Sequence, residues 1–348
     1  MAQDAPVRVG IIGAGGFTNT HMEELAKVDG VEVVAFCRRD PDALAEMQSK
    51  WDVGKGYTDY KELLADGEID AVDIVTPTDS HHPIAMDAIA AGKHVLCDKP
   101  LAMTASQCEE MLAAAEAAGV VHCTNFNQRG RTPVGQIKQL IDDGYLGDIY
   151  HINIWWGQSQ AHDLRPDATP WRFRAEAGGG TIYELIHAFD MALLLGGPVR
   201  RLAAMAPVME KNRPIPGYPD GMDCDAPDSS AFLLEFSTGS YAVIHTSFIT
   251  RGLDDSSGTH VHLDIAGSTG RLQNDGLTSI RGINGLGNRD VLTEVPPGPA
   301  YPQPYEQFVR AVLTGEPVKS SFAAGLEAAR LRDAAQLAAD EERWVRLD

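Results

Sequence analysis

Short apolar runs separated by helix-like stretches characterise the first third of the chain. The apolar runs predict buried strands, and they are Val7–Ile12, Val31–Cys37, Ala71–Val75, Val95–Cys97 and Val120–Thr124. The helices predicted between them run from Thr18 to about Val28, onward from Pro41, over Ile84–Ala91 and over Ala105–Ala118. Strands separated by helices of this length are typical of βαβ units, so this part of the chain predicts a parallel sheet.

After about residue 148 the pattern changes. Alternating β-type composition with Gly or Ser turns predicts strands over Ile149–Trp156, Ala231–Phe236, Ser240–Phe248 and His260–Ala266. One helix is predicted over Ile182–Leu195, whereas the Pro- and Gly-rich stretches Pro207–Pro227 and Asn284–Gln303 are predicted to be irregular. This part therefore predicts an α+β domain with a large, mainly antiparallel sheet.

Length and composition limit the classes of protein to which the chain can belong. Its 348 residues suggest two domains, and 44% hydrophobic with 22% charged residues is ordinary for a globular protein. No apolar run approaches the roughly 18 residues of a membrane span, and residues 1–6 lack the basic and apolar regions of a signal peptide. We therefore expect a cytoplasmic protein without membrane contact.

The net charge and the cysteines narrow the classes further. A formal charge of −20 repels a phosphate backbone, so nucleic acid is not expected as a partner. The five cysteines are odd in number, scattered and without a Cys-x-x-Cys pair, which predicts thiols in a reducing compartment rather than disulfides or a zinc site. No metal is therefore expected.

A glycine-rich turn, Gly13-Ala14-Gly15-Gly16-Phe17-Thr18, lies between the first predicted strand and the first predicted helix. Glycine there permits a tight turn and lets the backbone approach a pyrophosphate at the helix N-terminus. Glycine-rich turns are common, but the strand–turn–helix context predicts a dinucleotide site at Gly13, Gly15, Gly16 and Phe17. Thr18 stands where a third small residue is usual, so the packing of helix on strand must accommodate a larger side chain.

The end of the second predicted strand bears on the choice between the two nicotinamide cofactors. An acidic residue there binds the ribose 2′-hydroxyl of NAD, whereas arginine accommodates the 2′-phosphate of NADP. The strand ends in Arg38-Arg39-Asp40, and the two guanidinium groups favour NADP by charge and geometry. The alternative is that Asp40 binds the ribose hydroxyl while the arginines are merely solvated.

The segment Gly92–Leu101 brings a lysine to the end of another predicted strand. Val95–Cys97 is followed directly by Asp98, Lys99 and Pro100. Ligands of open α/β sheets bind outside the carboxyl ends of the strands, so Lys99 is placed to act on a ligand. The alternative is an ordinary Lys-Pro turn at the surface.

With these motifs in place, the chain resembles the glucose–fructose oxidoreductase / inositol dehydrogenase / rhizopine catabolism (Gfo/Idh/MocA) family of NAD(P)-dependent oxidoreductases over nearly its whole length. The matching segments are the Gly13 turn, Val75–His81, Gly92–Val95, Asp98–Pro100, Asn125–Arg129, Leu140–Gly147, Trp171–Arg172, Gly178–Gly180 and His187–Asp190. The resemblance implies a Rossmann dinucleotide-binding domain at 1–125. It also implies an α+β substrate-binding and oligomerisation domain at 126–348, with the last helices packing back on the first domain.

The resemblance also implies roles for residues of the first domain. Lys99 is implied to be catalytic and to hold the substrate oxygen. Thr76, Pro77 and His81 fall where the family packs its cofactor, although His81 could instead be an ordinary residue at the start of a helix. Asp98 stands where the family has a glutamate near the nicotinamide, and its shorter side chain leaves its role open.

A second catalytic segment follows the triple glycine. The family generally has an aspartate and a histidine four residues apart on one helix. Counting back from His187 leads to Tyr183, whereas counting forward from Gly180 leads to Glu184. Either spacing puts both side chains on one helical face. Glu184 is the preferred carboxylate, Tyr183 is the alternative, and His187 can exchange a proton near neutral pH.

Four further residues are candidates for contact with the substrate or the cofactor. They are Asn127, Arg129, Trp171 and Arg172. For the two arginines, a surface ion pair is the alternative. Trp155 and Trp156 are assigned to the core or to a subunit interface.

The resemblance implies hydride exchange between NADP, or NAD, and a hydroxyl or carbonyl group of a sugar, cyclitol or polyol, in a homodimer or homotetramer. In this hypothesis Lys99 polarises the substrate oxygen while His187 takes the hydroxyl proton. Two alternatives stay open. One is a redox-neutral enzyme in which transient oxidation by a bound dinucleotide labilises a glycosidic bond, and the other is a dinucleotide-binding regulator without turnover. The presence of Lys99 and His187 argues against the regulator.

Overall fold

The computed structural model of the chain describes residues 5–159, 170–215, 218–250, 259–275, 279–285, 291–296, 298 and 301–347. It divides into two compact units. The first unit is Met1–Asn127 with Pro302–Ala329, and the second is Gln128–Tyr301 with Arg330–Asp348. The sequence analysis predicted a domain boundary at 125/126. In the structure the chain first passes from the first unit to the second between residues 127 and 128. The return of 302–329 makes both units discontinuous along the chain.

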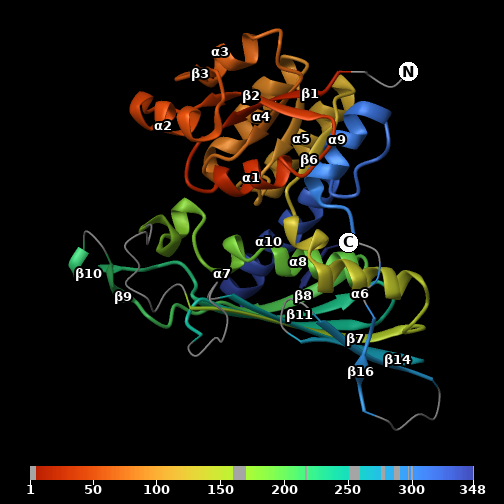
Figure 1. Ribbon diagram of the computed structural model, residues 1–348. Helices are drawn as coiled ribbons and strands as arrows, with labels where there is room; N and C mark the ends of the chain where they lie inside the picture. The colour runs from red at the N-terminus through yellow and green to blue at the C-terminus, as the bar shows by residue number, and fades with distance from the viewer. Residues whose placement is uncertain are drawn as a thin grey trace. The chain divides into compact units, whose positions relative to one another are not determined.

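The first unit contains a six-stranded sheet in the order β3-β2-β1-β4-β5-β6, in which every neighbouring pair is parallel (Figure 1). The strands are β1 Val7–Ile12, β2 Val31–Cys37, β3 Lys55–Tyr57, β4 Ala71–Ile74, β5 His94–Cys97 and β6 His122–Thr124. This confirms the predicted Rossmann fold. The strand order reverses between β1 and β4, where a doubly wound sheet opens a crevice for ligands.

Helices cover both faces of this sheet. They are α1 Thr18–Leu25, α2 Pro41–Trp51, α3 Tyr60–Ala65, α4 His81–Ala90, α5 Ala105–Ala118, α9 Pro304–Thr314 and the first part of α10 Phe322–Asp340. Because strand side chains alternate between faces, Val72 and Ile74 join a core with α4 and α5, whereas Ala71 joins a second core with α1, α2 and α9. Local signals fix the helix ends: Thr104 Oγ1 accepts a hydrogen bond from the backbone N–H of Gln107, and Gly119 at φ +66° ends α5.

The second unit contains a nine-stranded sheet in the order β16-β15-β14-β13-β7-β12-β11-β8-β17. Its strands are β7 Ile149–Gln158, β8 Val199–Met205, β11 Ser229–Phe236, β12 Tyr241–Ser247, β13 Thr259–Gly267, β14 Gly270–Asp275, β15 Ser279–Asn284, β16 Thr293–Glu294 and β17 Val345–Arg346. Only the β7–β12 pair is parallel among these described strands, which confirms the mainly antiparallel sheet.

Three predictions for this unit are wrong. The stretch 284–303 is not wholly irregular, because β16 Thr293–Glu294 within it pairs with β15. The stretch 207–227 is not wholly irregular, because β9 Asn212–Ile215 and β10 Tyr218–Asp223 pair within it. The single helix predicted over 182–195 is two helices, α7 Thr181–Glu184 and α8 His187–Gly196. The turn between them tightens, because the N–H of Ile186 donates to Tyr183 O and the N–H of Ala188 donates to Leu185 O.

The two faces of the large sheet differ in what covers them. On one face α8 packs on β7 and β12, and α7 packs on β11. The other face is more exposed. Leu233 and Val243, which are paired on the adjacent strands β11 and β12, have 38% and 42% of their surface exposed there. Helix α6 Thr132–Asp142 packs on α8. Among the helices of the described residues, none is both long and apolar enough to cross a membrane.

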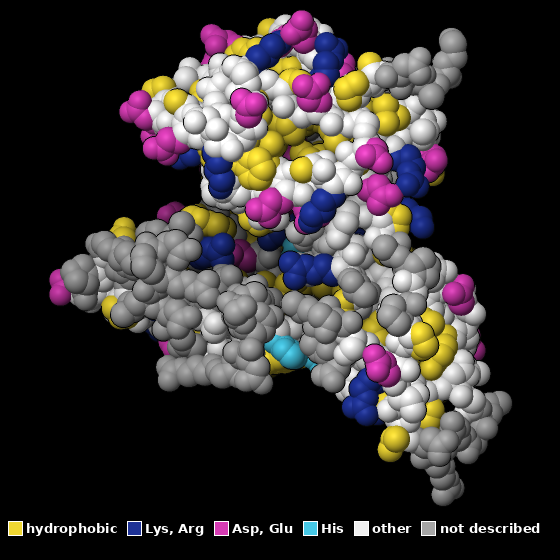
Figure 2. Space-filling view, in the orientation of Figure 1, with side chains coloured by type: hydrophobic (Ala, Val, Ile, Leu, Met, Phe, Trp, Pro, Cys, Tyr) yellow, Lys and Arg dark blue, Asp and Glu magenta, His cyan; other side chains and the backbone are white. Residues whose placement is uncertain are grey.

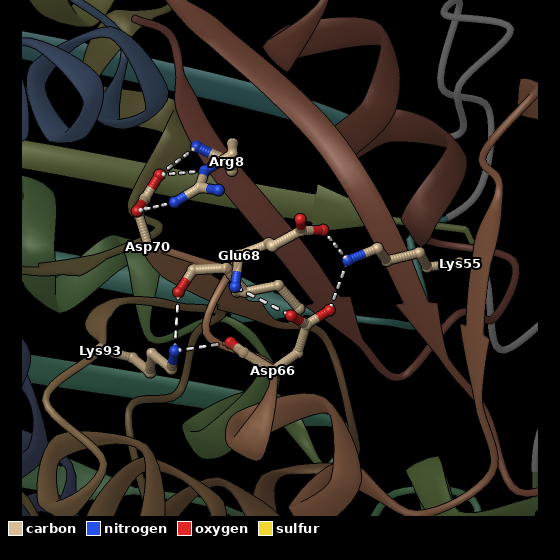
Figure 3. Close-up of polar contacts among 7 residues, drawn as sticks. Arg8, Lys55, Asp66, Glu68, Asp70 and Lys93 are labelled. Atoms are coloured by element: carbon tan, nitrogen blue, oxygen red, sulfur yellow. Dashed lines mark hydrogen bonds and ion pairs between the residues drawn. The ribbon is translucent and has the colours of Figure 1, made fainter.

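Charged side chains connect the segments at the amino ends of the strands in the first unit (Figure 3). This is the end of the sheet opposite to the glycine turn. Arg8 donates two side-chain hydrogen bonds to Asp70, at 3.0 and 2.9 Å. The Nζ atom of Lys55 lies 2.6 Å from Asp66 Oδ2, and the Nζ atom of Lys93 donates to the carbonyl oxygens of Asp66 and Ile69. These contacts tie the loop before β4 to β1 and β3.

This cluster predicts a loss of stability in acid. The hydrogen bond from Lys55 holds the pKa of Asp66 well below its usual range, and the one from Arg8 lowers the pKa of Asp70. A lowered carboxyl pKa stabilises the fold above the unfolded value of about 3.9, and the contribution is lost as the pH falls below it. Asp66→Asn should therefore lower the free energy of unfolding on the order of 1 kcal/mol at pH 7.

Urea unfolding at several pH values checks this expectation. The gap between wild type and Asp66→Asn should close below about pH 4, while Glu46→Gln, an exposed carboxylate on α2, should leave the midpoint unchanged. A gap of the same size at every pH would contradict the role of the ionised Asp66.

Charged side chains do not gather by sign on the visible face of the first unit (Figure 2). On the face of the first unit that Figure 2 shows, Lys and Arg side chains lie interspersed with Asp and Glu. A surface that binds a polyanion needs a continuous basic patch. This face therefore offers no such surface, in keeping with the net charge of −20.

Candidate active site

The glycine turn between β1 and α1 is shaped by one obligatory glycine. Gly13 has φ +101°, and a Cβ there would lie 2.7 Å from the carbonyl carbon and oxygen of Val75. Gly15 and Gly16 differ, because a Cβ on Gly15 would meet nothing closer than Gly13 O at 3.7 Å and one on Gly16 would meet nothing within 4 Å. The turn is thus tight at its start and open at the next two glycines.

Thr18 closes the turn from the inside. Its side chain is fully buried, and its Oγ1 donates to Gly13 O (3.0 Å) and accepts from the Gly15 N–H (3.1 Å). The larger side chain is thereby accommodated as a brace of the turn. Phe17 is 47% exposed at the start of α1, with its ring edge against His21.

The two arginines after β2 have different surroundings. The Arg38 Nη1 donates to Ala14 O at 2.8 Å, so this guanidinium braces the glycine turn. Arg39 is exposed. Asp40 is the N-cap of α2, and its Oδ1 accepts hydrogen bonds from the N–H groups of Asp42 and Ala43 at 3.1 Å each. The carboxylate that was the alternative ribose ligand therefore has a structural role already.

The loop after β4 is tied to the lysine segment through His81. Thr76 and Pro77 follow β4 directly, and His81 is the first residue of α4. The ring is 1% exposed, and its Nδ1 and Nε2 lie 2.9 Å from Pro100 O and 2.8 Å from Thr76 O. Both nitrogens are thus engaged by backbone carbonyls, and His81 joins two loops instead of presenting a nitrogen to a ligand.

Lys99 lies just beyond the carboxyl end of β5, next to the loop after β4. Its side chain is half-buried, and the Lys99–Pro100 peptide bond is cis. The Asp98 N–H donates to Ile74 O at 2.9 Å, which holds the segment against β4. The Asp98 carboxylate accepts a hydrogen bond from Asn125 Nδ2 at 3.4 Å.

In the second unit, α7 and α8 bury Glu184 and His187, which are 9% and 5% exposed. Arg172 Nη1 lies 3.0 Å from Glu184 Oε2, and the same guanidinium lies 5.4 Å from the centroid of the Trp171 ring. The His187 ring stacks on Trp156, with centroids 5.6 Å apart and an interplanar angle of 16°. This stacking fixes the plane of a ring that can exchange protons.

The two candidates for the carboxylate position have different surroundings. Tyr183 is half-buried and its ring faces Arg332, a fully buried guanidinium 4.7 Å from the ring centroid. Glu184 instead carries its charge beside Arg172. A carboxylate held by an arginine is closer in chemistry to the family's aspartate than a phenol is. Glu184 stays our preferred assignment.

Arg129 is paired in the interior and not at the surface. Its Nε donates to Asp190 at 2.9 and 3.1 Å, and the two residues are 5% and 0% exposed. Burial raises the pKa of Asp190, while Arg129 acts to lower it. Asn127, the other candidate of this loop, has a buried Oδ1 with no hydrogen-bond partner among the described residues.

Sequence reasoning missed several buried polar groups around these residues. Asp190 was noted only as part of a motif, and no local signal pointed to Arg332 or to the pair of His21 with Asp73 at 2.8 Å. Their partners lie far away along the chain, so no spacing rule reveals them. Within the described residues, no group of three or more His, Cys, Asp or Glu is arranged to hold a metal ion.

Comparison with known families matches both halves of the chain. Residues 7–126 match the oxidoreductase family with an NAD-binding Rossmann fold, and residues 134–273 match the GFO/IDH/MocA C-terminal domain. Together these matches span well over half of the 348 residues.

Individual relatives are similar along almost their whole length. Myo-inositol 2-dehydrogenase of Thermotoga maritima is 28% identical, over 98% of this chain and 99% of that protein. Levoglucosan dehydrogenase of Pseudarthrobacter phenanthrenivorans is 25% identical, over 97% of each. Among solved structures, a levoglucosan dehydrogenase in complex with NADH and L-sorbose has a TM-score of 0.89 at 25% identity, covering 98% of this chain and 99% of that one.

Proposed function

Because the chain belongs to the GFO/IDH/MocA oxidoreductase family, we propose that it is an NAD(P)-dependent dehydrogenase or reductase of a sugar, cyclitol or polyol. The observation that carries this proposal lies in the first unit. The half-buried Lys99, after β5, and the open glycine turn, after β1, both lie at the carboxyl ends of one parallel sheet, on either side of β4 and next to the switch point between β1 and β4. Relatives named for inositol and levoglucosan support the substrate class.

The residues of the first unit fit a dinucleotide. The space at Gly15 and Gly16 admits a pyrophosphate to the start of α1, and Phe17, Thr76 and Pro77 line the same edge. When bound, the nicotinamide supplies the hydride chemistry. The chain has to bind the substrate, orient it and move one proton.

Each of the candidate catalytic residues has one role in the proposal. The Lys99 ammonium donates a hydrogen bond to the substrate oxygen and polarises it. His187, fixed in plane by Trp156, takes the hydroxyl proton in oxidation and returns it in reduction. Glu184 balances the charge that His187 gains, and Arg172 holds Glu184 in place. Asn127, Trp171 and Tyr183 are assigned to contacts with the substrate.

A panel of neutral sugars, cyclitols and polyols, each assayed with NAD and with NADP, tests the function. We expect the absorbance of the reduced dinucleotide to change in step with substrate turnover. Cleavage of a glycoside with tightly held dinucleotide and no net absorbance change would replace the proposal with a redox-neutral reaction. Binding of dinucleotide with no turnover of any compound would favour a regulator.

The preference for NADP over NAD is assigned to Arg39. This guanidinium is exposed after β2, and charge-assisted hydrogen bonds to a 2′-phosphate stabilise a complex by about 1.5–3 kcal/mol. Arg39→Leu should therefore lower kcat/KM with NADP by roughly 10- to 100-fold and change kcat/KM with NAD little. A higher wild-type kcat/KM with NAD than with NADP would contradict the assignment.

We assign the assembly, a homodimer or homotetramer, to the open face of the nine-stranded sheet. Leu233, Val243 and Tyr241 lie on adjacent strands there with 38%, 42% and 45% of their surface exposed, and Met205 at the end of β8 is 70% exposed. An apolar patch of this kind marks an interaction site. Light scattering of the intact protein gives the mass that checks this.

The proposed compartment is the cytoplasm, and all five cysteines are buried and outside disulfides.

A further inference from the structure

A buried polar chain runs through the first unit beneath the candidate dinucleotide site. Its members are Asp73 on β4, His21 on α1, Asn125 after β6, Tyr305 on α9 and Asp98 after β5. The first four are at most 1% exposed. None of these four has a role in the proposed reaction, and the chain ends on the residue next to Lys99.

The inner part of the chain is a histidine–carboxylate pair. His21 Nδ1 lies 2.8 Å from Asp73 Oδ2, and both side chains are fully buried. Because a carboxylate only accepts hydrogen bonds, Nδ1 carries the proton and donates a hydrogen bond to Asp73 Oδ2. His21 Nε2 faces Asn125 Nδ2 at 3.3 Å, so the pair fixes one side of the Asn125 amide.

Asn125 is the hub of the chain. Its Nδ2 lies 2.8 Å from the Tyr305 hydroxyl and 3.4 Å from Asp98 Oδ1, in addition to its contact with His21. Burial raises the pKa of Tyr305 far above its usual range, so the hydroxyl stays protonated. The backbone N–H of Asn125 also donates to Cys97 O at 2.8 Å. Asn125 thus holds the end of β5 through both its backbone and its side chain.

We propose that Asn125, supported by His21, is a positioning residue for Lys99, and that the Asp98 carboxylate serves as the anchor through which it acts. The inference rests on the proposed function only for the role of Lys99. It also gives Asp98 a role that its short side chain left open. The carboxylate is directed to Asn125, inside the unit, and holds the peptide unit that carries Lys99.

A purely stabilising role accounts poorly for this arrangement. Buried charges and polar atoms are costly, and apolar side chains of similar volume usually stabilise a core at least as well. The Asp73 Oδ1 and Asn125 Oδ1 atoms are buried without a hydrogen-bond partner among the described residues, which adds to the cost. Placement of a reacting group is a benefit that offsets it, because a misplacement of about 1 Å can lower a rate by about 100-fold.

A double-mutant cycle on Asn125 and Asp98 tests the proposal. Asn125→Ala and Asp98→Ala should each lower kcat by roughly 10- to 100-fold while the dissociation constant of the reduced dinucleotide, followed by its fluorescence, changes little. The double variant should be no slower than the slower single variant, because both remove one interaction. Asp98→Asn should retain most activity, since its amide oxygen still accepts from Asn125.

Lys93→Met is the matched control, since Lys93 is a buried polar side chain at the opposite edge of the same sheet (Figure 3). It should lower Tm without changing kcat. The proposal would be overturned if the fold-losses in kcat of the two single variants multiplied in the double variant. It would also be overturned if Asn125→Ala had a lower Tm with an unchanged kcat.

A crystal structure of Asn125→Ala provides a readout independent of turnover. The Asp98 side chain, which follows β5, should leave its place beside residue 125, and its unchanged position would also overturn the proposal. This readout holds even if no sugar or polyol is a substrate.

Discussion

Replacing Lys99 by methionine is expected to lower kcat by about 10³-fold while the dissociation constants of NAD and NADP change less than about threefold. Methionine keeps most of the length of the side chain and removes its charge. A preorganised donor aimed at a reacting oxygen typically contributes about 10²–10³ in kcat, and an ammonium adds a full charge to the hydrogen bond. Steady-state kinetics with the best substrate of the panel, together with fluorescence titration of the reduced dinucleotide, measures both quantities.

Lys61→Met controls for the loss of a lysine from the same unit. Its side chain on α3 is 68% exposed and lies 3.9 Å from Asp87, which is not one of the candidate site residues, so kcat should not change. A Lys99→Met enzyme with normal kcat would refute the assignment of Lys99. A loss confined to dinucleotide affinity would make Lys99 a cofactor ligand only.

Replacing His187 by asparagine is expected to lower kcat by about 10²–10⁴-fold, the usual contribution of a positioned general acid or base. Asparagine can still donate and accept hydrogen bonds but cannot exchange the proton. The variant should also lose the limb of the pH–rate profile that reports the imidazole. Both effects are measured by kcat between about pH 5 and pH 9, a range that spans the ordinary histidine pKa near 6.5.

His82→Asn is the control for this experiment. His82 lies on α4 in the first unit and pairs with Glu110 at the surface, so its loss should leave both kcat and the profile intact. If His187→Asn kept the wild-type profile, another group would have to carry the proton. Rescue of the variant by added imidazole would instead strengthen the assignment.

The first unit could be predicted from local pattern because each of its strands but one is an apolar run. The exception is β3, whose residues Lys55-Gly56-Tyr57 carry no such run, and it was missed together with the short α3 that follows it. In the second unit, β8 was missed because its buried position is Leu202 alone, between arginines and alanines. Pairing with β11 and β17, and not its own sequence, makes this segment a strand.

The candidate site shows the same division between local and distant information. The glycine turn and the Lys99 segment are contiguous, so both could be located from the sequence. The partners of Arg129 and His21 lie 61 and 52 residues away, and only the folded chain brings them together. The break between α7 and α8 was hidden for another reason, because the 180–187 segment is apolar enough to read as one helix.

The discontinuous first unit has a consequence for the order in which the protein folds during synthesis. Its core includes Tyr305 and Phe308 of α9 and Phe322 of α10, all at most 1% exposed. A ribosome reaches them only after making the 128–301 segment, which at 5–20 residues per second takes roughly 10–35 s. Until then the nascent parallel sheet exposes the apolar surface that these aromatic rings later cover. This interval is when the growing chain has the greatest need of a chaperone.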